Sequence, residues 1–218
     1  MKIWSSQYTF EHPWDTVVKA AWRKYPNPIN TAVSGIDVVQ RDLVLARRTS
    51  SSSDARSGLS RPRPLLRTHR ILQSEWSIPK WVTALIGLDN PTFSHEYSEV
   101  DPSRRKMTLK TVNVNCQNFV NVVETMEYQP HPEDASRTLL EQRTEITVKG
   151  VPLISYMESL LVSTFERNTH KGRRGMEWVL ENLRHEFDEL SKKVGVPEVL
   201  PSINCAAGPP AASTAEPS

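Results

Sequence analysis

In the stretch LLEQRTEITVKG, residues 139–150, two sets of side chains occupy alternate positions. Charged or polar residues stand at Glu141, Arg143, Glu145 and Thr147, and mostly apolar ones at Leu140, Thr144, Ile146 and Val148. Successive side chains of a β-strand point to opposite faces, so the alternation predicts a strand with one wet face and one covered face. The chain is therefore expected to build a sheet that buries one side.

Strand patterns recur elsewhere in the chain and predict seven strands in total. Besides 137–149, they cover residues 1–10, 34–45, 66–75, 93–101, 105–115 and 119–130. In the first of them Trp4, Tyr8 and Phe10 share one face. The short polar connections DPSRR (101–105) and PHPEDASR (130–137) are typical of turns between neighbouring strands. This arrangement predicts an antiparallel meander.

Two segments change to helical spacing. After Pro13, apolar residues recur at three- and four-residue steps as far as Tyr25, and the turn KYPNP, residues 24–28, then ends the helix because proline cannot continue it. A long helix is predicted over 154–190 from Met157, Leu161, Phe165, Gly172, Met176, Val179, Leu183, Phe187 and Leu190. It should lie across the sheet, which gives an α+β fold.

One domain over residues 1–190 is expected from a chain of 218 residues with 38% hydrophobic content. The low-complexity, basic segment 46–64 is expected to be a solvated excursion between two strands, either a plain linker or an anion-binding loop. Residues 191–218 are rich in Pro, Ala and Ser and are expected to form a disordered tail.

Several functional classes find little support. The chain has 27 basic and 25 acidic residues, so its net charge is too small to create an electrostatic field that would attract nucleic acid. The two cysteines form neither a disulfide framework nor a metal site, so no metal and no cofactor are expected. No nucleophile elbow, phosphate-binding glycine loop or pair of metal-spaced histidines occurs, so no catalytic residue is assigned and an enzyme is not expected.

The long helix carries polar residues where its apolar stripe should be buried. Asn168 falls within the stripe and Lys171 at its edge. Burying an unpartnered amide costs about 2–7 kcal/mol, so these groups are either satisfied inside the core or border a polar-ended cavity. Gly172 and Gly175 each cost a helix about 1 kcal/mol, which indicates close approach of backbone or ligand.

The segment WSIPKWVTALIG, residues 76–87, is too apolar for an ordinary surface loop. Its apolar side chains are Trp76, Ile78, Trp81, Val82, Leu85 and Ile86. Two interpretations stay open. The segment could plug one end of the core, or it could form a hinged lid that lies on a membrane or on a bound acyl chain.

Seven short motifs occur in one order along the chain: MKIWSSQYTFEHPWDTV, KYPNP, HRILQSEW, VDPSRRKM, YQPHPED, EITVKG and NTHKGRRGMEWVL. Together they resemble the PRELI-domain family, in its slowmo branch, over residues 1–190. The resemblance implies a seven-stranded antiparallel sheet curved around a lipid cavity. It also implies that an N-terminal helix, a short lid helix within 76–90 and a long C-terminal helix cover this sheet.

The same resemblance implies a function. Proteins of this branch carry phospholipid between the outer and inner mitochondrial membranes, reside in the intermembrane space, touch membrane surfaces transiently and bind a small helical partner with twin Cys-x9-Cys motifs. Lys24, Asn168 and Lys171 match lipid headgroup positions of the family. Ala32, Ser74, Ser77 and Thr164 stand where its phosphatidic-acid carriers have basic residues, which favours phosphatidylserine as the cargo over phosphatidic acid.

Rival interpretations remain for this sequence. A non-enzymatic adaptor could accept an amphipathic helix in the groove instead of a lipid, and a lipid-modifying enzyme is a third class. Lys24 itself could be an exposed lysine that interacts with the dipole of the first helix. Alternatively, the two prolines of KYPNP hold its ammonium near the cavity, where it would bind a phosphate as a point charge.

Overall fold

The computed structural model describes residues 1–46, 63–76, 78–88 and 91–194 and contains one antiparallel sheet. Its strands are β1 (Lys2–Phe10), β2 (Val33–Ala46), β3 (Arg63–Ser74), β4 (Thr92–Asp101), β5 (Lys106–Asn113), β6 (Val120–Pro130) and β7 (Thr138–Val148). They lie in the order β1-β7-β6-β5-β4-β3-β2. The predicted seven-stranded antiparallel α+β fold is confirmed.

Three helices accompany the sheet: α1 (Trp14–Trp22), α2 (Lys80–Ile86) and α3 (Ile154–Val194). The KYPNP turn was predicted to end the first helix, and α1 ends just before it, at Trp22. Pro26 has no N–H to donate to the carbonyl of Trp22. α3 runs four residues beyond the predicted end at Leu190, so the predicted tail from 191 begins too early. Residues 47–62 of the predicted excursion, and 195–218, lie outside the described residues.

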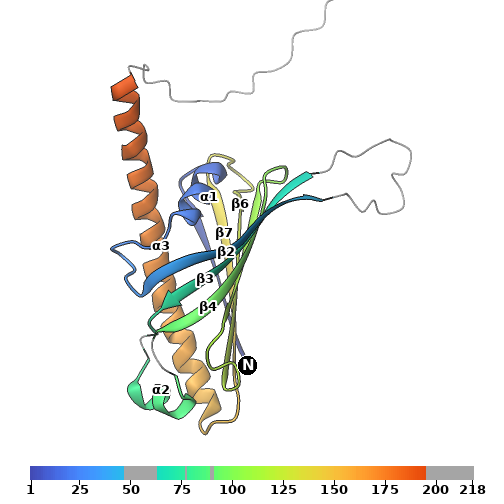
Figure 1. The fold of residues 1–218 in the computed structure, drawn as a ribbon, viewed down its shortest axis with the longest axis vertical. Helices are drawn as coiled ribbons and strands as arrows, with labels where there is room; N and C mark the ends of the chain where they lie inside the picture. The colour runs from blue at the N-terminus through green and yellow to red at the C-terminus, as the bar shows by residue number, and fades with distance from the viewer. Residues whose placement is uncertain (47–62, 77, 89–90, 195–218) are drawn as a thin grey trace, which may run out of the picture. The chain divides into compact units, whose positions relative to one another are not determined.

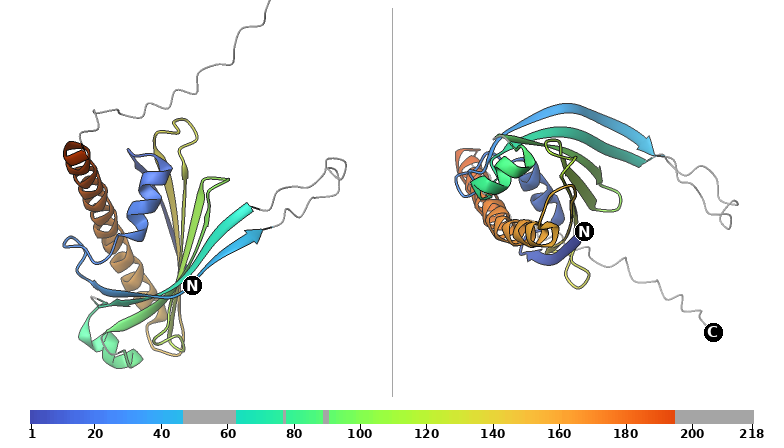
Figure 2. Two further views of the ribbon diagram at one scale, coloured as in Figure 1. Left: turned by 45° about the horizontal axis from the view of Figure 1, so that its top comes forward. Right: turned by 90° about the horizontal axis from the view of Figure 1, so that it is seen from below.

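Met1–Leu183 form one compact unit. Within it, α1 and residues 154–183 of α3 lie on the same side of the curved sheet (Figure 1), and the strands curl around them (Figure 2). The chain leaves β1 at one edge of the sheet and enters β2 at the other edge. Helix α1 and residues 23–32 must therefore cross the concave face, which brings the KYPNP turn over the interior of the fold.

The buried side chains form two apolar clusters. The first joins α1, the sheet and the second half of the α3 segment through residues such as Phe10, Val17 and Met176. Trp14 belongs to it and donates its indole N–H to the carbonyl of Tyr128 at 3.0 Å, which ties α1 to β6. The second cluster lies where α2 meets the beginning of α3 and includes Val82, Ile86, Ile146 and Met157.

The KYPNP turn is held rigidly by Asn27. Its side-chain Nδ2 donates to the carbonyl of Lys24 at 2.6 Å, while its Oδ1 accepts from the N–H groups of Ile29 at 3.0 Å and Asn30 at 2.7 Å. The turn packs against the two glycines of α3. A methyl group added at Gly175 would lie 3.0 Å from Asn27 Nδ2. The close neighbours of these glycines are therefore the side chains of Lys24 and Asn27 rather than the backbone or ligand suggested by the sequence.

Gly172 provides the same clearance for a different neighbour. A methyl group there would lie 3.2 Å from Lys24 Nζ, the far end of a flexible side chain. The two glycines thus form a shallow notch in α3, which is the glycine notch of residues 172 and 175. Asn27 fills one end of the notch and the Lys24 ammonium fills the other.

We expect Gly175→Ala to lower the free energy of unfolding by about 1 kcal/mol, measured by chemical denaturation. Overpacking costs about 1–3 kcal/mol, which outweighs the gain of about 1 kcal/mol from replacing a helical glycine. Gly172→Ala is the matched control, because the lysine beside it can move, and it should leave stability unchanged or slightly higher. Equal stability changes in the two variants would contradict the rigid seating of Asn27.

Candidate functional site

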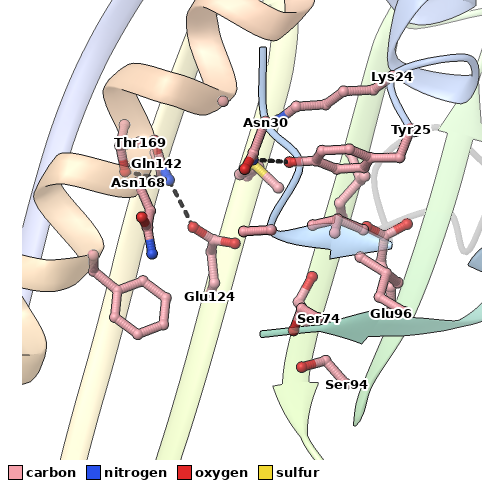
Figure 3. A pocket seen from close by; sticks show the side chains of 18 of the residues that line it. Lys24, Tyr25, Asn30, Ser74, Ser94, Glu96, Glu124, Gln142, Asn168 and Thr169 are labelled. Carbon is pink, nitrogen blue, oxygen red and sulfur yellow. Dashed lines mark hydrogen bonds between the residues drawn. The ribbon is translucent and has the colours of Figure 1, made fainter. Parts of the chain in front are cut away.

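A cavity of about 190 Å³ lies between the concave face of the sheet and α3. Its walls come from all seven strands, α1, the segment 24–32 and α3. One part of its lining is apolar and includes Phe10, Leu109, Met126 and Met176. The polar part gathers side chains from distant segments: Lys24, Tyr25, Asn30, Glu96, Glu124, Gln142, Asn168 and Thr169 (Figure 3).

Lys24 follows α1 and is half-buried at the glycine notch. Its ammonium lies 5.1 Å from the ring centroid of Tyr25. Burial disfavours the charged form, but the electrostatic influence of Tyr25, Tyr128 and Glu124 outweighs it and raises the pKa of Lys24 above its ordinary value. Lys24 makes no ion pair with any described residue. The cavity therefore contains a positioned cation without a directly bonded counter-ion.

Glu124 projects from β6 into the cavity (Figure 3). Its Oε1 accepts a hydrogen bond of 2.6 Å from Gln142 Nε2, which also donates to Thr169 Oγ1 at 3.2 Å. Burial and the nearby Glu96 raise the pKa of the Glu124 carboxyl, although the Gln142 hydrogen bond and Lys24 oppose this rise. Among the described residues no cation forms an ion pair with Glu124.

Arg70 and Glu96 lie opposite each other on β3 and β4 and form a buried ion pair at the cavity wall. Each side chain is only 5% exposed, and Arg70 Nε donates to Glu96 Oε1 at 2.8 Å. The guanidinium also lies 5.1 Å from the ring centroid of Trp22. These two charges compensate each other, so they shape the cavity wall without demanding a ligand.

Arg173 is a third cation of the cavity lining, after Lys24 and Arg70. Its guanidinium donates to Ser6 Oγ and lies 4.9 Å from the ring centroid of Tyr8, while its buried Nε has no hydrogen-bond partner. Burial lowers the pKa of Arg173, against the opposing influence of Tyr8 and Tyr128. Within the described part of the chain no carboxylate pairs with it, so one donor remains to be satisfied.

The structure brings together two of the three predicted headgroup residues. Lys24 and Asn168 both line the cavity, and no described residue bonds to the side-chain amide of Asn168. Lys171 is exposed and does not line the cavity, so the prediction that it faces the interior is wrong. Thr169 and Gly172 are buried and mark the centre of the apolar stripe of the helix. Asn168 lies between this centre and Lys171, so Lys171 falls outside the stripe.

The segment predicted as a plug or a lid divides its apolar side chains between two faces. Val82 and Ile86 are buried in the second apolar cluster, and Trp76 and Ile78 pack partly against it. Trp81 is 48% exposed and Leu85 39% exposed. One face of α2 therefore closes the core while the other face meets solvent. Residue 77 of this segment, and residues 89 and 90 of the lid range 76–90, lie outside the described residues.

The positions that the sequence marked as uncharged behave differently from one another. Ala32 and Ser74 line the cavity. Thr164 is buried and donates its hydroxyl to the carbonyl of Leu160 at 2.9 Å, whereas Ser77 lies outside the described residues. Two of the four positions therefore contribute small, neutral surface to the cavity.

Glu124 and Arg173 were missed by the reasoning from sequence. The strand pattern does contain a signal that Glu124 points inward. It occupies an even position of β6, as do the inward-facing Val122, Met126 and Tyr128. Arg173 sits beside Gly172 in a helix whose charged residues are otherwise mostly on the solvent side. Nothing in the spacing alone separates it from them.

Neither a metal centre nor a membrane-spanning helix occurs among the described residues. In residues 1–46, 63–76, 78–88 and 91–194, no three side chains of the ligand types His, Cys, Asp and Glu come together to hold a metal ion. Over the same residues, no helix combines the length and the apolar composition needed to cross a bilayer.

Two solved structures share the fold at low sequence identity. The aromatase/cyclase Zhui from Streptomyces sp. R1128 matches with a TM-score of 0.52 and 12% identity, over 83% of this chain and 93% of its own. The protein TTHA0849 from Thermus thermophilus matches with a TM-score of 0.51 and 14% identity, over 84% of this chain and 99% of its own. At such identities the likeness concerns the architecture alone.

Relatives in sequence are considerably closer. The mitochondrial protein UPS2 of Saccharomyces cerevisiae is 33% identical over 95% of this chain and 87% of its own length. The slowmo homolog of Dictyostelium discoideum is 27% identical over 84% of this chain and 73% of its own. The model of the PRELI-like family matches residues 57–186. The chain therefore belongs to the PRELI-like family.

Proposed function

We propose that this protein is a non-enzymatic carrier that moves phosphatidylserine between the outer and inner mitochondrial membranes. The observation that carries the proposal is a cavity with an apolar part and a polar part, in which the Lys24 ammonium lacks a bonded counter-ion. A phospholipid has the same division into acyl chains and a charged headgroup. The yeast relative UPS2 is a mitochondrial protein, which supports the location.

Each polar group of the cavity has a role in this proposal. Lys24 attracts the phosphate, and the free amide of Asn168 donates to one of its oxygens. Arg173 offers its unsatisfied Nε–H to a second acceptor of the headgroup, such as a carboxylate. Ala32 and Ser74 keep the rest of the wall neutral, which favours phosphatidylserine over the more highly charged phosphatidic acid. No step requires a proton to be transferred.

Loading the cavity requires movement. Its volume of about 190 Å³ is below the roughly 300–1,000 Å³ typical of small-ligand sites, so two acyl chains do not fit in the closed form. The second apolar cluster lies beneath α2, where Val82 and Ile86 fill space that chains could occupy. We propose that α2 swings outward when lipid enters and that acyl chains replace these side chains in the cluster.

The exposed side of α2 is suited to touch a membrane. Trp81 stacks on Tyr156 with ring centroids 6.2 Å apart, which joins α2 to the beginning of α3. Beside Tyr156, Leu153 is 68% exposed and holds a φ of 60°, a backbone conformation uncommon for leucine. Ile154 is exposed as well. Side chains of this kind insert shallowly at a lipid interface, so we propose this surface as the docking site.

Location in the intermembrane space and a small helical partner with twin Cys-x9-Cys motifs complete the proposal. Both rest on membership of the family and on the resemblance of the sequence motifs to its slowmo branch. Co-precipitation from mitochondria, with the precipitated small proteins identified by mass spectrometry, tests the partner. Protease protection in mitochondria with a ruptured outer membrane tests the compartment.

Native mass spectrometry of the protein purified with its partner tests the function itself. Bound phospholipid, together with transfer of phosphatidylserine between liposomes, is the expected result. Protein that is consistently empty and inactive in transfer would overturn the carrier and would favour an adaptor that binds a helix in the groove. Release of a modified lipid after prolonged incubation would instead favour an enzyme.

We expect Lys24→Met to reduce the transfer of phosphatidylserine between liposomes roughly tenfold or more. The variant loses a charge-assisted contact of about 1.5–3 kcal/mol but keeps an unbranched side chain only one atom shorter. Lys171→Ala is the matched control, because the Lys171 side chain is exposed, and its transfer rate should stay at the wild-type level. Normal transfer by folded Lys24→Met would show that the headgroup binds elsewhere.

We expect the double substitution Trp81→Asp and Leu85→Asp to weaken binding to liposomes while the sheet stays folded, because carboxylates resist transfer to the interface. Co-sedimentation with anionic vesicles measures binding, and circular dichroism checks the fold. The control changes Val39 and Leu43 to Asp, since these β2 side chains are also exposed, at 65% and 70%. Equal loss of binding in both double variants would refute a specific docking surface on α2.

A further inference from the structure

Glu124 is a half-buried carboxylate of the cavity lining and differs from the buried carboxylates of the described residues. Glu96 pairs with Arg70, and Glu158 lies 2.7 Å from the amino terminus at Met1. Asp101 lies 3.5 Å from a guanidinium nitrogen of Arg63. Glu124 has only the neutral amide of Gln142, although it sits in the middle of a wall that is otherwise built from side chains such as Val122 and Met126.

This placement costs stability, and a function for the carboxylate would explain why the cost is tolerated. Burial of an unpaired carboxylate is unfavourable, and its raised pKa records that cost. A glutamine or methionine of similar size would fill the same space without a charge. The Gln142 amide is neutral and therefore supplies no counter-charge. It also shares its donor group with Thr169. An acceptor therefore faces the cavity with no cation bonded to it.

We infer that Glu124 accepts the ammonium group of the headgroup, so that the cavity selects glycerophospholipids with a primary amine. Lys24 and Asn168, which line the same cavity (Figure 3), then hold the phosphate. This assignment rests on the proposed carrier function and adds to it the feature of the cargo that is recognised. It makes Glu124 a specificity-determining residue.

The balance of charge in the lining agrees with such a headgroup. Lys24, Arg70 and Arg173 face Glu96 and Glu124, and Glu75 lies exposed at the rim. The interior thus carries one more cation than anions, and its charges are of mixed sign. A serine headgroup has one ammonium, one phosphate and one carboxylate, which is the complementary pattern. A headgroup that carries only negative charge would bring its oxygens toward Glu124 and be repelled.

The test compares two lipids that differ only at the amine. Liposome transfer is measured for phosphatidylserine and for synthetic phosphatidyl-3-hydroxypropionate, which keeps the phosphate and carboxylate but has hydrogen in place of the ammonium. The partner complex is used throughout. Wild-type protein should transfer phosphatidylserine at least roughly tenfold faster, as expected for one hydrogen-bonded charge pair.

Glu124→Gln removes the negative charge and should therefore abolish this preference, mainly by slowing the transfer of phosphatidylserine. The substitution keeps the shape of the side chain and the oxygen that accepts from Gln142, so the fold should be retained. Glu124→Asp keeps the charge and should retain part of the preference, which also covers the case in which the glutamine variant does not fold. Glu127→Gln is the matched control on the same strand. Glu127 points to the opposite face and pairs with Lys106 at 2.8 Å, so its removal should leave the preference intact.

The outcomes separate the inference from the function on which it rests. If wild-type protein transfers neither lipid, the carrier function itself fails. If it transfers both equally, or if folded Glu124→Gln keeps the wild-type preference for the amine, the role of Glu124 is overturned while the carrier function stands. Loss of the preference in Glu124→Gln but not in Glu127→Gln supports the inference.

Discussion

The seating of the KYPNP turn against α3 is the contact on which the arrangement of the interior depends. The chain has to cross the concave face from β1 at one sheet edge to β2 at the other. Polar backbone in such a crossing needs partners. The Asn27 side chain forms three hydrogen bonds with backbone groups, one to Lys24 within the turn and two from Ile29 and Asn30 just after it. The glycine notch lets the turn approach α3 closely. A rigid turn against a notched helix holds Lys24 over the sheet, where a flexible loop would release it to solvent.

The cavity follows from this seating together with the curvature of the sheet. Apolar clusters form where α1 and α2 pack against the strands and α3, and the polar side chains of the turn and the strands keep the space between them from filling with apolar groups. The Arg70–Glu96 pair strengthens the wall without leaving a charge to satisfy. Lys24 and Glu124 differ, because neither has a bonded partner of opposite charge among the described residues. Structure and charge therefore make this polar region the candidate site.

Much of this architecture could be predicted from the sequence because it is expressed in short-range periodicity. Alternation along residues such as 139–150 predicted the strands within a few positions, and Pro26 with Pro28 predicted a fixed turn after the first helix. Lys171 was placed wrongly because a stripe edge is uncertain by one helical position, and only the packing of Thr169 and Gly172 decides which side is buried. The inward direction of Glu124 could have been predicted from its even position in the strand. A single charged residue in a strand, however, does not reveal whether a cation lies across the interior.

Mixed charge in the cavity bears on how a carrier could release its cargo. Lys24 and Glu124 lie close enough to influence each other's pKa, so each partly offsets the other's burial while the cavity is empty. A site built only from cations would carry an uncompensated charge whenever the lipid left, and that cost would favour retention. Under the proposed function, Lys24 and Glu124 interact with each other when the cavity is empty and with the charges of the headgroup when the lipid is bound. The difference in electrostatic energy between the loaded and empty forms is then small, which suits a protein that must bind and release the same lipid at two membranes.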